Sequence, residues 1–248
     1  VHLDLIVGLP GEDAAHCADS LDRVFLLYAD HLQLGTLKLL PGTPLREQAR
    51  DLGYRWDRSP PYEVLCHPLL SFREMARFKR YAALLERLWN SGYLCATLAG
   101  LVAHCFENRL SRCFDALLAE AGEGFASDNL QPDSLFGGIA DFVVARLPQQ
   151  PALGEWLLWD YCHYSLLSRK TPAWIAGRLE QGERLSVDGT RRRLPVVTLS
   201  ETGVALLNRL SAEHRRPGRY ALWPRQHKKG KPVEIYPLDL LSDAPQPD

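Results

Sequence analysis

The chain has 248 residues, 29 Lys and Arg against 30 Asp and Glu, and 46% hydrophobic residues, which is enough to bury a sizeable core in two domains. No run of about 18 apolar residues and no signal peptide stands out, so we predict no transmembrane helix and no membrane partner. Six scattered cysteines do not form a disulfide framework, and we predict reduced thiols and a cytoplasmic location.

The first predicted element is a strand over residues 2–7, which are almost continuously apolar apart from Asp4. Such a run is typical of a parallel strand covered on both faces. Gly8 ends the run, and Pro10 and Gly11 turn the chain. Because this strand starts at once and would leave both edges open, we expect the chain to be the C-terminal part of a longer protein. Proteolytic processing or a shortened expression product is the alternative.

A predicted helix and a second strand follow. Asp13 precedes a segment whose apolar residues recur at helical spacing, namely Ala14, Cys17, Ala18, Leu21, Val24, Phe25 and Tyr28. Residues 32–40 then predict a strand that ends in a Pro/Gly loop at residues 41–44. A strand, a helix and a strand of this kind form a βαβ unit, and ligands gather at the carboxyl ends of its strands. Neither loop has the spacing of a phosphate-binding or dinucleotide-binding motif, and taken singly the glycines need only make turns.

Two segments together resemble a known family. Residues 4–12 (DLIVGLPGE) and residues 37–45 (LKLLPGTPL) look like the last two strands of a radical SAM barrel. The most similar group has an N-terminal cobalamin-binding domain, a radical SAM core and a C-terminal domain of unknown function. The resemblance covers about residues 1–95. It implies that the first part of the chain is α/β, the last two βα units of a partial TIM barrel.

The resemblance also implies a cofactor site. In radical SAM enzymes the fifth-strand motif packs against the adenosine of S-adenosylmethionine, and the end of the sixth strand completes the pocket. The residues at these positions are Ile6, Gly8, Leu9, Pro10, Leu39, Leu40 and Pro41. The family motif has Glu three residues after the glycine, where this chain has Gly11, with Glu12 one position later. The resemblance gives no catalytic residue.

The cluster motif of that family is absent. Radical SAM enzymes hold a 4Fe-4S iron–sulfur cluster with Cys-x3-Cys-x2-Cys, and no pair of cysteines here has that spacing: Cys17, Cys66, Cys95, Cys105, Cys113 and Cys162. We therefore expect the cluster and cobalamin only in the full-length protein, whose missing N-terminal part is the implied partner. This chain alone should neither ligate the cluster nor cleave S-adenosylmethionine.

The predicted barrel end extends to residue 92. Residues 57–61 interrupt the hydrophobic pattern and are predicted to be a linker, and residues 62–65 are expected to be extended. Ser71 and Glu74 form a capping box that starts a helix, and Gly92 ends it. This helix would close the barrel, which makes residues 1–92 the first predicted domain.

A mainly helical accessory domain is predicted over residues 93–241, with helices over 95–120, 132–147 and 151–168. His104-Cys105 and Cys162-His163 are adjacent pairs, and neighbours on a helix point about 100° apart and seldom share one ion. We predict that these cysteines pack in the core and that the chain has no metal site.

Two β-hairpins are predicted at the C-terminal end of this domain, which makes it α+β. The first joins residues 184–187 to 191–198 through Asp188-Gly189, and the second joins 220–223 to 233–236. A short helix over 200–210 lies between them, and a disordered tail is expected over 242–248.

The basic segment, residues 191–231, supports a second hypothesis. It holds eleven Lys and Arg against two Glu, a local net charge of +9. With Tyr220 and Trp223 it could track a phosphate backbone and stack on bases, which predicts a nucleic-acid-binding module or an RNA-modifying radical SAM enzyme. The alternative is an ordinary solvated hairpin face, and a third hypothesis is a partner-binding scaffold. The substrate is not predicted: alternation along a regular strand allows at most one of Gln33 and Lys38 to face the site.

Overall fold

The computed structural model describes residues 1–121, 124–125, 131–147, 149–164, 184–187, 190–193, 196–211, 214–223 and 234–238. The described chain mixes helices with small sheets, as the α+β prediction requires. Contacts divide it into two units: the first is residues 1–92 with 102–129, and the second is residues 93–101 with 130–248. The domain limits at residues 92 and 241 stay predictions.

The predicted βαβ unit is present in the first unit. Strands β1 (His2–Val7) and β2 (His31–Thr36) are parallel, with His2 opposite His31 and Val7 opposite Thr36. Helix α1 (Ala14–Phe25) joins them, and its N-cap residue Asp13 accepts a hydrogen bond from the His16 amide at 2.8 Å. The local sequence signals therefore predicted this supersecondary unit correctly.

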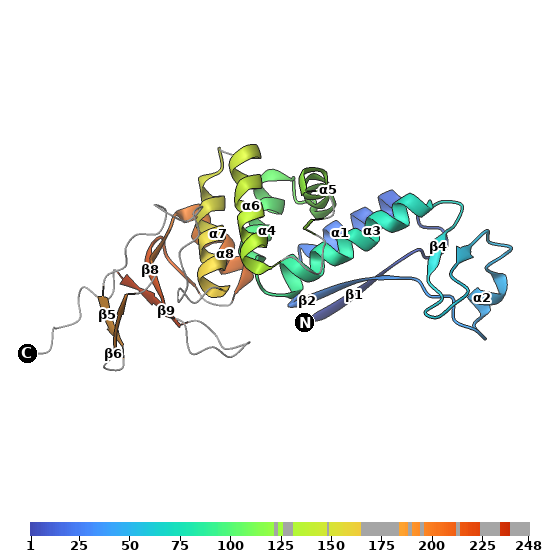
Figure 1. Cartoon of the computed structure of the whole chain (residues 1–248), viewed down its shortest axis with the longest axis horizontal. Helices are drawn as coiled ribbons and strands as arrows, with labels where there is room; N and C mark the ends of the chain where they lie inside the picture. Colours follow the sequence, from blue (N-terminus) through green and yellow to red (C-terminus); the bar gives the residue numbers. More distant parts are fainter. Residues whose placement is uncertain are drawn as a thin grey trace, which may run out of the picture. The chain divides into compact units, whose positions relative to one another are not determined.

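Only one face of this strand pair is covered within the described residues, although a strand covered on both faces was expected. Helices α1 and α3 lie on the same side of β1 and β2 (Figure 1). Val7, Leu32 and Leu34 are buried on that side. Asp4 and Gln33 point away from it and are exposed.

Strand β2 is shorter than predicted, because it ends at Thr36 rather than near Leu40. Beyond Thr36 the backbone changes partners: the Leu37 carbonyl accepts from Val64 and the Leu39 amide donates to Tyr62, both at 2.9 Å. Hydropathy alone does not reveal this change. After residue 40 the chain forms helix α2 (Pro44–Gln48) and the antiparallel strands β3 (Arg55–Trp56) and β4 (Val64–Cys66).

The predicted capping box starts helix α3 (Phe72–Leu85), which continues as a π-helical turn, η1 (Glu86–Asn90). Glu74 and Ser71 bond reciprocally, as the motif requires. The Asn90 side chain bonds both the amide and the carbonyl of Leu32 at 3.0 Å. This end of the helix is therefore fixed to the start of β2.

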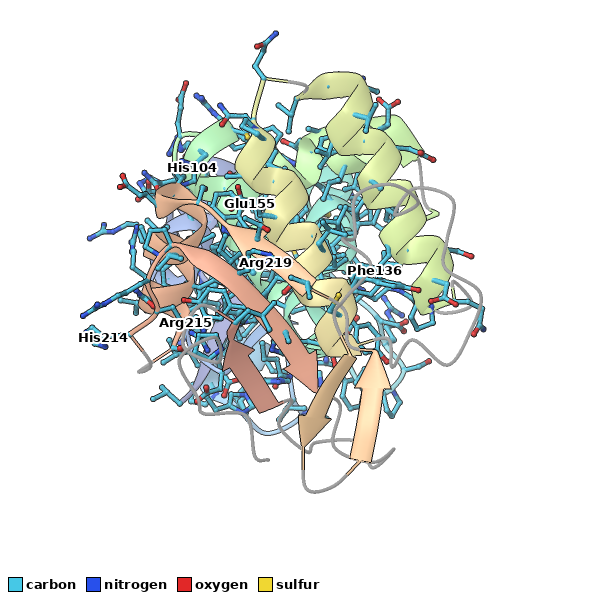
Figure 2. All side chains as sticks on the ribbon, turned by 90° about the vertical axis from the view of Figure 1, so that its left-hand side faces the viewer. His104, Phe136, Glu155, His214, Arg215 and Arg219 are labelled. Atoms are coloured by element: carbon cyan, nitrogen blue, oxygen red, sulfur yellow. The ribbon has the colours of Figure 1, made fainter. Side chains whose placement is uncertain are left out.

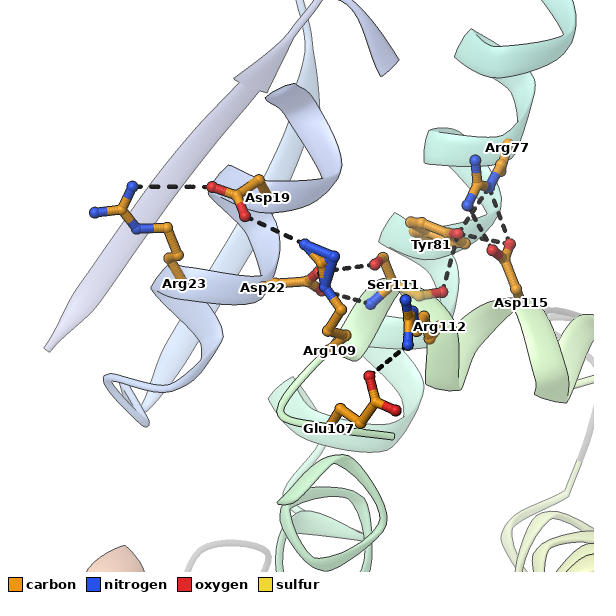
Figure 3. A network of polar contacts seen from close by, with 10 residues as sticks. All are labelled: Asp19, Asp22, Arg23, Arg77, Tyr81, Glu107, Arg109, Ser111, Arg112 and Asp115. Atoms are coloured by element: carbon orange, nitrogen blue, oxygen red, sulfur yellow. Dashed lines mark hydrogen bonds and ion pairs between the residues drawn. The ribbon is translucent and has the colours of Figure 1, made fainter. Parts of the chain in front are cut away.

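The helical stretch predicted over 95–120 is two helices, α4 (Cys95–Cys105) and α5 (Leu110–Ala121). Glu107 and Asn108 between them have φ values of 54° and 60°, which a continuous helix does not allow. In the first unit, α5 is fixed to α1 through Asp22, whose carboxylate accepts from the amide and hydroxyl of Ser111 at 2.7 and 2.9 Å (Figure 3).

In the second unit, helices α6 (Pro132–Arg146) and α7 (Pro151–Tyr164) occupy two of the predicted segments. Residues 165–168 of the third prediction lie outside the described residues. Trp156 is 1% exposed, and its indole N–H donates to the Gly203 carbonyl at 3.1 Å. Asp160 accepts hydrogen bonds from amides at the amino end of α4, so a carboxylate in the core caps the start of that helix.

The C-terminal strands follow the predictions in part. Strand β5 (Arg184–Val187) pairs with β6 (Thr190–Arg193), but the strand predicted over 191–198 is divided into β6 and β7 (Val196–Leu199). Pro195, which lacks an N–H group, lies between them in the sequence.

The three-stranded sheet has the order β7-β8-β9. Strands β8 (Gly218–Trp223) and β9 (Glu234–Pro237) form the second predicted hairpin, and Ser200 caps helix α8 (Glu201–Leu210) as predicted. The turn residues 188–189 and 228–231 and the tail 242–248 lie outside the described residues. None of the described helices has the length and apolar character needed to cross a bilayer.

Candidate site at the carboxyl ends of the parallel strands

The seven residues assigned to the adenosine pocket divide into an exposed and a buried group. Ile6, Leu9 and Leu40 are large apolar side chains with 49%, 37% and 48% of their surface exposed. Pro10 and Pro41 beside them are also exposed. Because β1 and β2 are parallel, the loops that follow them leave the same edge of the sheet. An exposed apolar rim thus lies where a ligand of such strands would bind.

Gly8 belongs to the buried group and turns toward the core. Its φ of +99° favours glycine, and a Cβ there would lie 3.4 Å from the Met75 methyl group and 3.6 Å from Val64. The Gly8 carbonyl accepts a hydrogen bond from the Tyr54 hydroxyl at 3.0 Å. Gly8 therefore contributes to the site indirectly, because its lack of a side chain lets the end of β1 pack closely against the core.

Leu39 is also fully buried, with 0% exposure. Its carbonyl accepts from the Arg46 guanidinium at 2.8 Å. The same guanidinium lies 4.7 Å from the centre of the Trp56 ring and 5.3 Å from that of Tyr62. Leu39 thus anchors the loop, and its neighbour Leu40 is the side chain that meets solvent.

The open face of β1 and β2 is polar at its start and apolar near its end. The Asp4 carboxylate lies 3.0 Å from Nε2 of His2, whose ring centre is 4.4 Å from that of His31. Further along, Ile6 stands opposite Gly35, which has no side chain to cover it. Gln33 is exposed on this face, whereas Lys38 lies beyond β2 in an isolated bridge to Glu63.

Burial disfavours the charged form of three ionisable groups behind the site. Burial, followed by the charge of Glu12, raises the pKa of Cys17 to about 11, and its sulfur lies 3.8 Å from the Glu12 carboxylate. Burial also raises the pKa of Tyr54 and lowers that of His67, whose rings are 4.9 Å apart. Cys17 is therefore not a thiolate nucleophile at neutral pH.

Sequence reasoning missed Arg46, Tyr54 and His67, which shape this site from the short helix α2 and from the irregular segments that follow it. Their roles depend on contacts with residues distant in sequence, such as the Tyr54 bond to Gly8, 46 residues away. Only the nearby aromatic residues Trp56 and Tyr62, with which an arginine often stacks, gave a signal for Arg46.

The cysteines do not fit an iron–sulfur cluster. All six are free thiols, and Cys17, Cys113 and Cys162 are buried in packed regions. Among the residues that the structure describes, no three His, Cys, Asp or Glu side chains are grouped to hold a metal ion. In the adjacent pair Cys162-His163, Cys162 is 3% exposed, and Nδ1 of His163 lies 2.8 Å from the Trp159 carbonyl.

The basic segment is described only in part, since residues 194–195, 212–213 and 224–233 fall outside the described residues. Figure 2 labels His214, Arg215 and Arg219 in the second unit. The Arg215 guanidinium lies 5.1 Å from the Trp159 ring centre and donates to the Ser211 hydroxyl at 2.9 Å. Arg215 therefore has a packing role, and nucleic-acid binding by the segment stays a prediction.

Comparison with known proteins places the chain in a family. Residues 50–193, more than half of the chain, match the family model described as a protein of unknown function (DUF4080). The chain therefore belongs to the DUF4080 family. The matched segment begins after β2, so it includes Tyr54 and His67 but none of the seven residues assigned to adenosine. No curated protein matches the chain.

Proposed function

We propose that this chain is the C-terminal part of a cobalamin-dependent radical SAM enzyme. It would supply one wall of the S-adenosylmethionine pocket and a cap on the substrate side. The reaction would proceed through an adenosyl radical or a methyl transfer, on a substrate that the chain does not specify.

The observation that best supports this proposal is that the two faces of the β1-α1-β2 unit differ in what covers them. Helices cover one face of its parallel strands, and the exposed Ile6, Leu9 and Leu40 lie on the open face or at the carboxyl ends. In (β/α) barrels the helices form the outer ring, the other strand face points inward, and ligands bind at the carboxyl ends. The open face is therefore suited to be the inner surface of a barrel whose other strands precede β1.

The family assignment supports the same proposal, because DUF4080 domains accompany radical SAM and cobalamin proteins. The two segments that resemble the last barrel strands add to it. Since the cysteines of this chain do not fit a cluster, the cluster ligands belong to the residues proposed to precede it. When bound, the cluster and S-adenosylmethionine would supply the radical chemistry.

The residues of this chain would bind and orient the adenosine. Leu9 and Leu40 offer exposed apolar surface to a flat base, and burying such surface contributes about 25 cal/mol per Å². Pro10 and Pro41 stiffen the two loops, and Gly8 brings the end of β1 close to the core. Together they would exclude water from one side of the base.

The test uses the protein expressed from its complete reading frame and purified without oxygen. Leu9→Asp and Leu40→Asp should each weaken equilibrium binding of S-adenosylmethionine at least tenfold and reduce 5′-deoxyadenosine formation. Leu27→Asp is the matched control, because Leu27 is 68% exposed and lies between α1 and β2, away from the carboxyl ends of the strands.

Equal affinity in all three variants would refute the pocket assignment. A complete reading frame without Cys-x3-Cys-x2-Cys would refute the radical SAM proposal as a whole.

A further inference from the structure

A cavity in the first unit is lined with arginines. It lies between α3 and α5 and has a volume of about 480 Å³, within the range of small-molecule sites. Arg73, Arg77 and Arg80 line it from α3, and Asp115, Leu118 and Ala119 line it from α5. The three arginines are spaced by four and three residues, so they follow one face of the helix.

The two carboxylates of this cavity are already engaged. Asp115 accepts from Nε of Arg77 at 2.9 Å and lies 2.6 Å from the Tyr81 hydroxyl (Figure 3). The Glu74 carboxylate accepts from the amide and hydroxyl of Ser71 at 2.7 and 2.6 Å, as part of the capping box. Arg77 is therefore balanced by Asp115, and Glu74 is held at the helix cap.

Two guanidinium groups remain without a counterion. Among the described residues, the side chains of Arg73 and Arg80 form no hydrogen bond and no ion pair. Nε of Arg80 is buried and has no acceptor. A buried donor without a partner is unfavourable, so such groups usually have a ligand or water. Arg73 is exposed and lies one helical turn before Arg77.

We propose that this cavity binds a phosphate-bearing small molecule. A phosphate monoester carries about −1.5 to −2 charges at pH 7, which matches two free guanidinium groups better than a single carboxylate does. Arg80 would donate from Nε to a phosphate oxygen, Arg73 would add charge from the exposed side, and Leu118 and Ala119 would contact the organic part. The bonds from Asp115 to Arg77 and Tyr81 hold the wall in place before the ligand arrives.

This inference is independent of the radical SAM proposal, because it uses α3 and α5 and none of the strand-end residues. Either can fail without the other. Binding is therefore measured directly, by calorimetric titration of the whole chain with inorganic phosphate and pyrophosphate, and with citrate at the same ionic strength.

The wild-type chain should bind phosphate or pyrophosphate at least tenfold more tightly than citrate. Arg73→Gln with Arg80→Gln should weaken phosphate binding at least tenfold. The control pair Arg50→Gln with Arg58→Gln removes the same charge from two exposed arginines of the same unit and should leave binding unchanged.

A further variant, Arg80→Lys, separates the site from general charge, since lysine keeps the charge but lacks the buried Nε donor. It should weaken binding as well, and its smaller change protects the test if the double variant does not fold. Equal effects of the two double variants, tighter citrate binding, or no phosphate binding at millimolar concentration would overturn the proposal.

Discussion

The buried carboxylate of Asp160 should make the second unit less stable as pH rises. Asp160 is 5% exposed, and it accepts from the amides of Ala96 and Thr97 at 3.2 and 2.7 Å and from the Thr97 hydroxyl at 2.7 Å. Burial nevertheless dominates and raises its pKa to about 7, from an ordinary value of 3.8. Between these values the folded state binds a proton that the unfolded state has released.

The free energy of unfolding should therefore fall as the pH rises from about 4 to about 7. A shift of about three units corresponds to an upper limit of about 4 kcal/mol at 1.36 kcal/mol per unit. Asp160→Asn cannot titrate, so it should lack this part of the pH dependence, although it is less stable than wild type because an amide presents only one acceptor oxygen.

Urea unfolding at pH 5 and pH 8, followed by tryptophan fluorescence, measures this effect, because Trp156 and Trp159 are buried in the same unit. The stability difference between wild type and Asp160→Asn should be larger at pH 5 than at pH 8. Identical pH dependence of the two proteins would refute the assignment of a raised pKa to this carboxyl group.

Two other contacts and the charge of the basic segment can be tested in the same way. Asp22→Ala should lower the stability of the first unit by about 2 kcal/mol, because it leaves the buried Ser111 amide and hydroxyl without an acceptor. Asp19→Ala, at a half-exposed position, is the control and should change the stability by less than about 0.5 kcal/mol, with both variants measured by urea unfolding. Gly100→Ala should destabilise the fold despite the helix propensity of alanine, because the added Cβ would lie 2.1 Å from Cε3 of Trp156; an unchanged melting temperature would contradict that contact. If the basic segment binds RNA, the affinity should fall steeply between 50 and 200 mM salt, and the absence of binding at low salt would reject the nucleic-acid hypothesis.

Local signals in the sequence predicted the start and end of several elements. The capping box of Ser71 and Glu74 and the apolar periodicity of residues 14–25 act within one or two helical turns, so their effect does not depend on the rest of the fold. The same holds for Ser200 at the start of α8.

Boundaries that depend on partners were predicted less well. Strand β2 ends at Thr36 because residues 37–39 pair with residues 62–64, and the break between α4 and α5 depends on left-handed residues at Glu107 and Asn108. The apolar pattern continues through both places, so periodicity could not reveal them.

For the candidate site, sequence patterns were enough to predict that two glycine- and proline-rich loops follow two parallel strands. Which of the seven residues meet solvent depends on packing between distant segments: Gly8 lies against Met75, and the carbonyls of Gly8 and Leu39 accept hydrogen bonds from Tyr54 and Arg46, all of which come later in the chain. The arginine cavity was likewise set by tertiary contacts. Charges spaced along α3 show in the sequence, but the pairing of Arg77 with Asp115, 38 residues away, decides which guanidinium groups stay free.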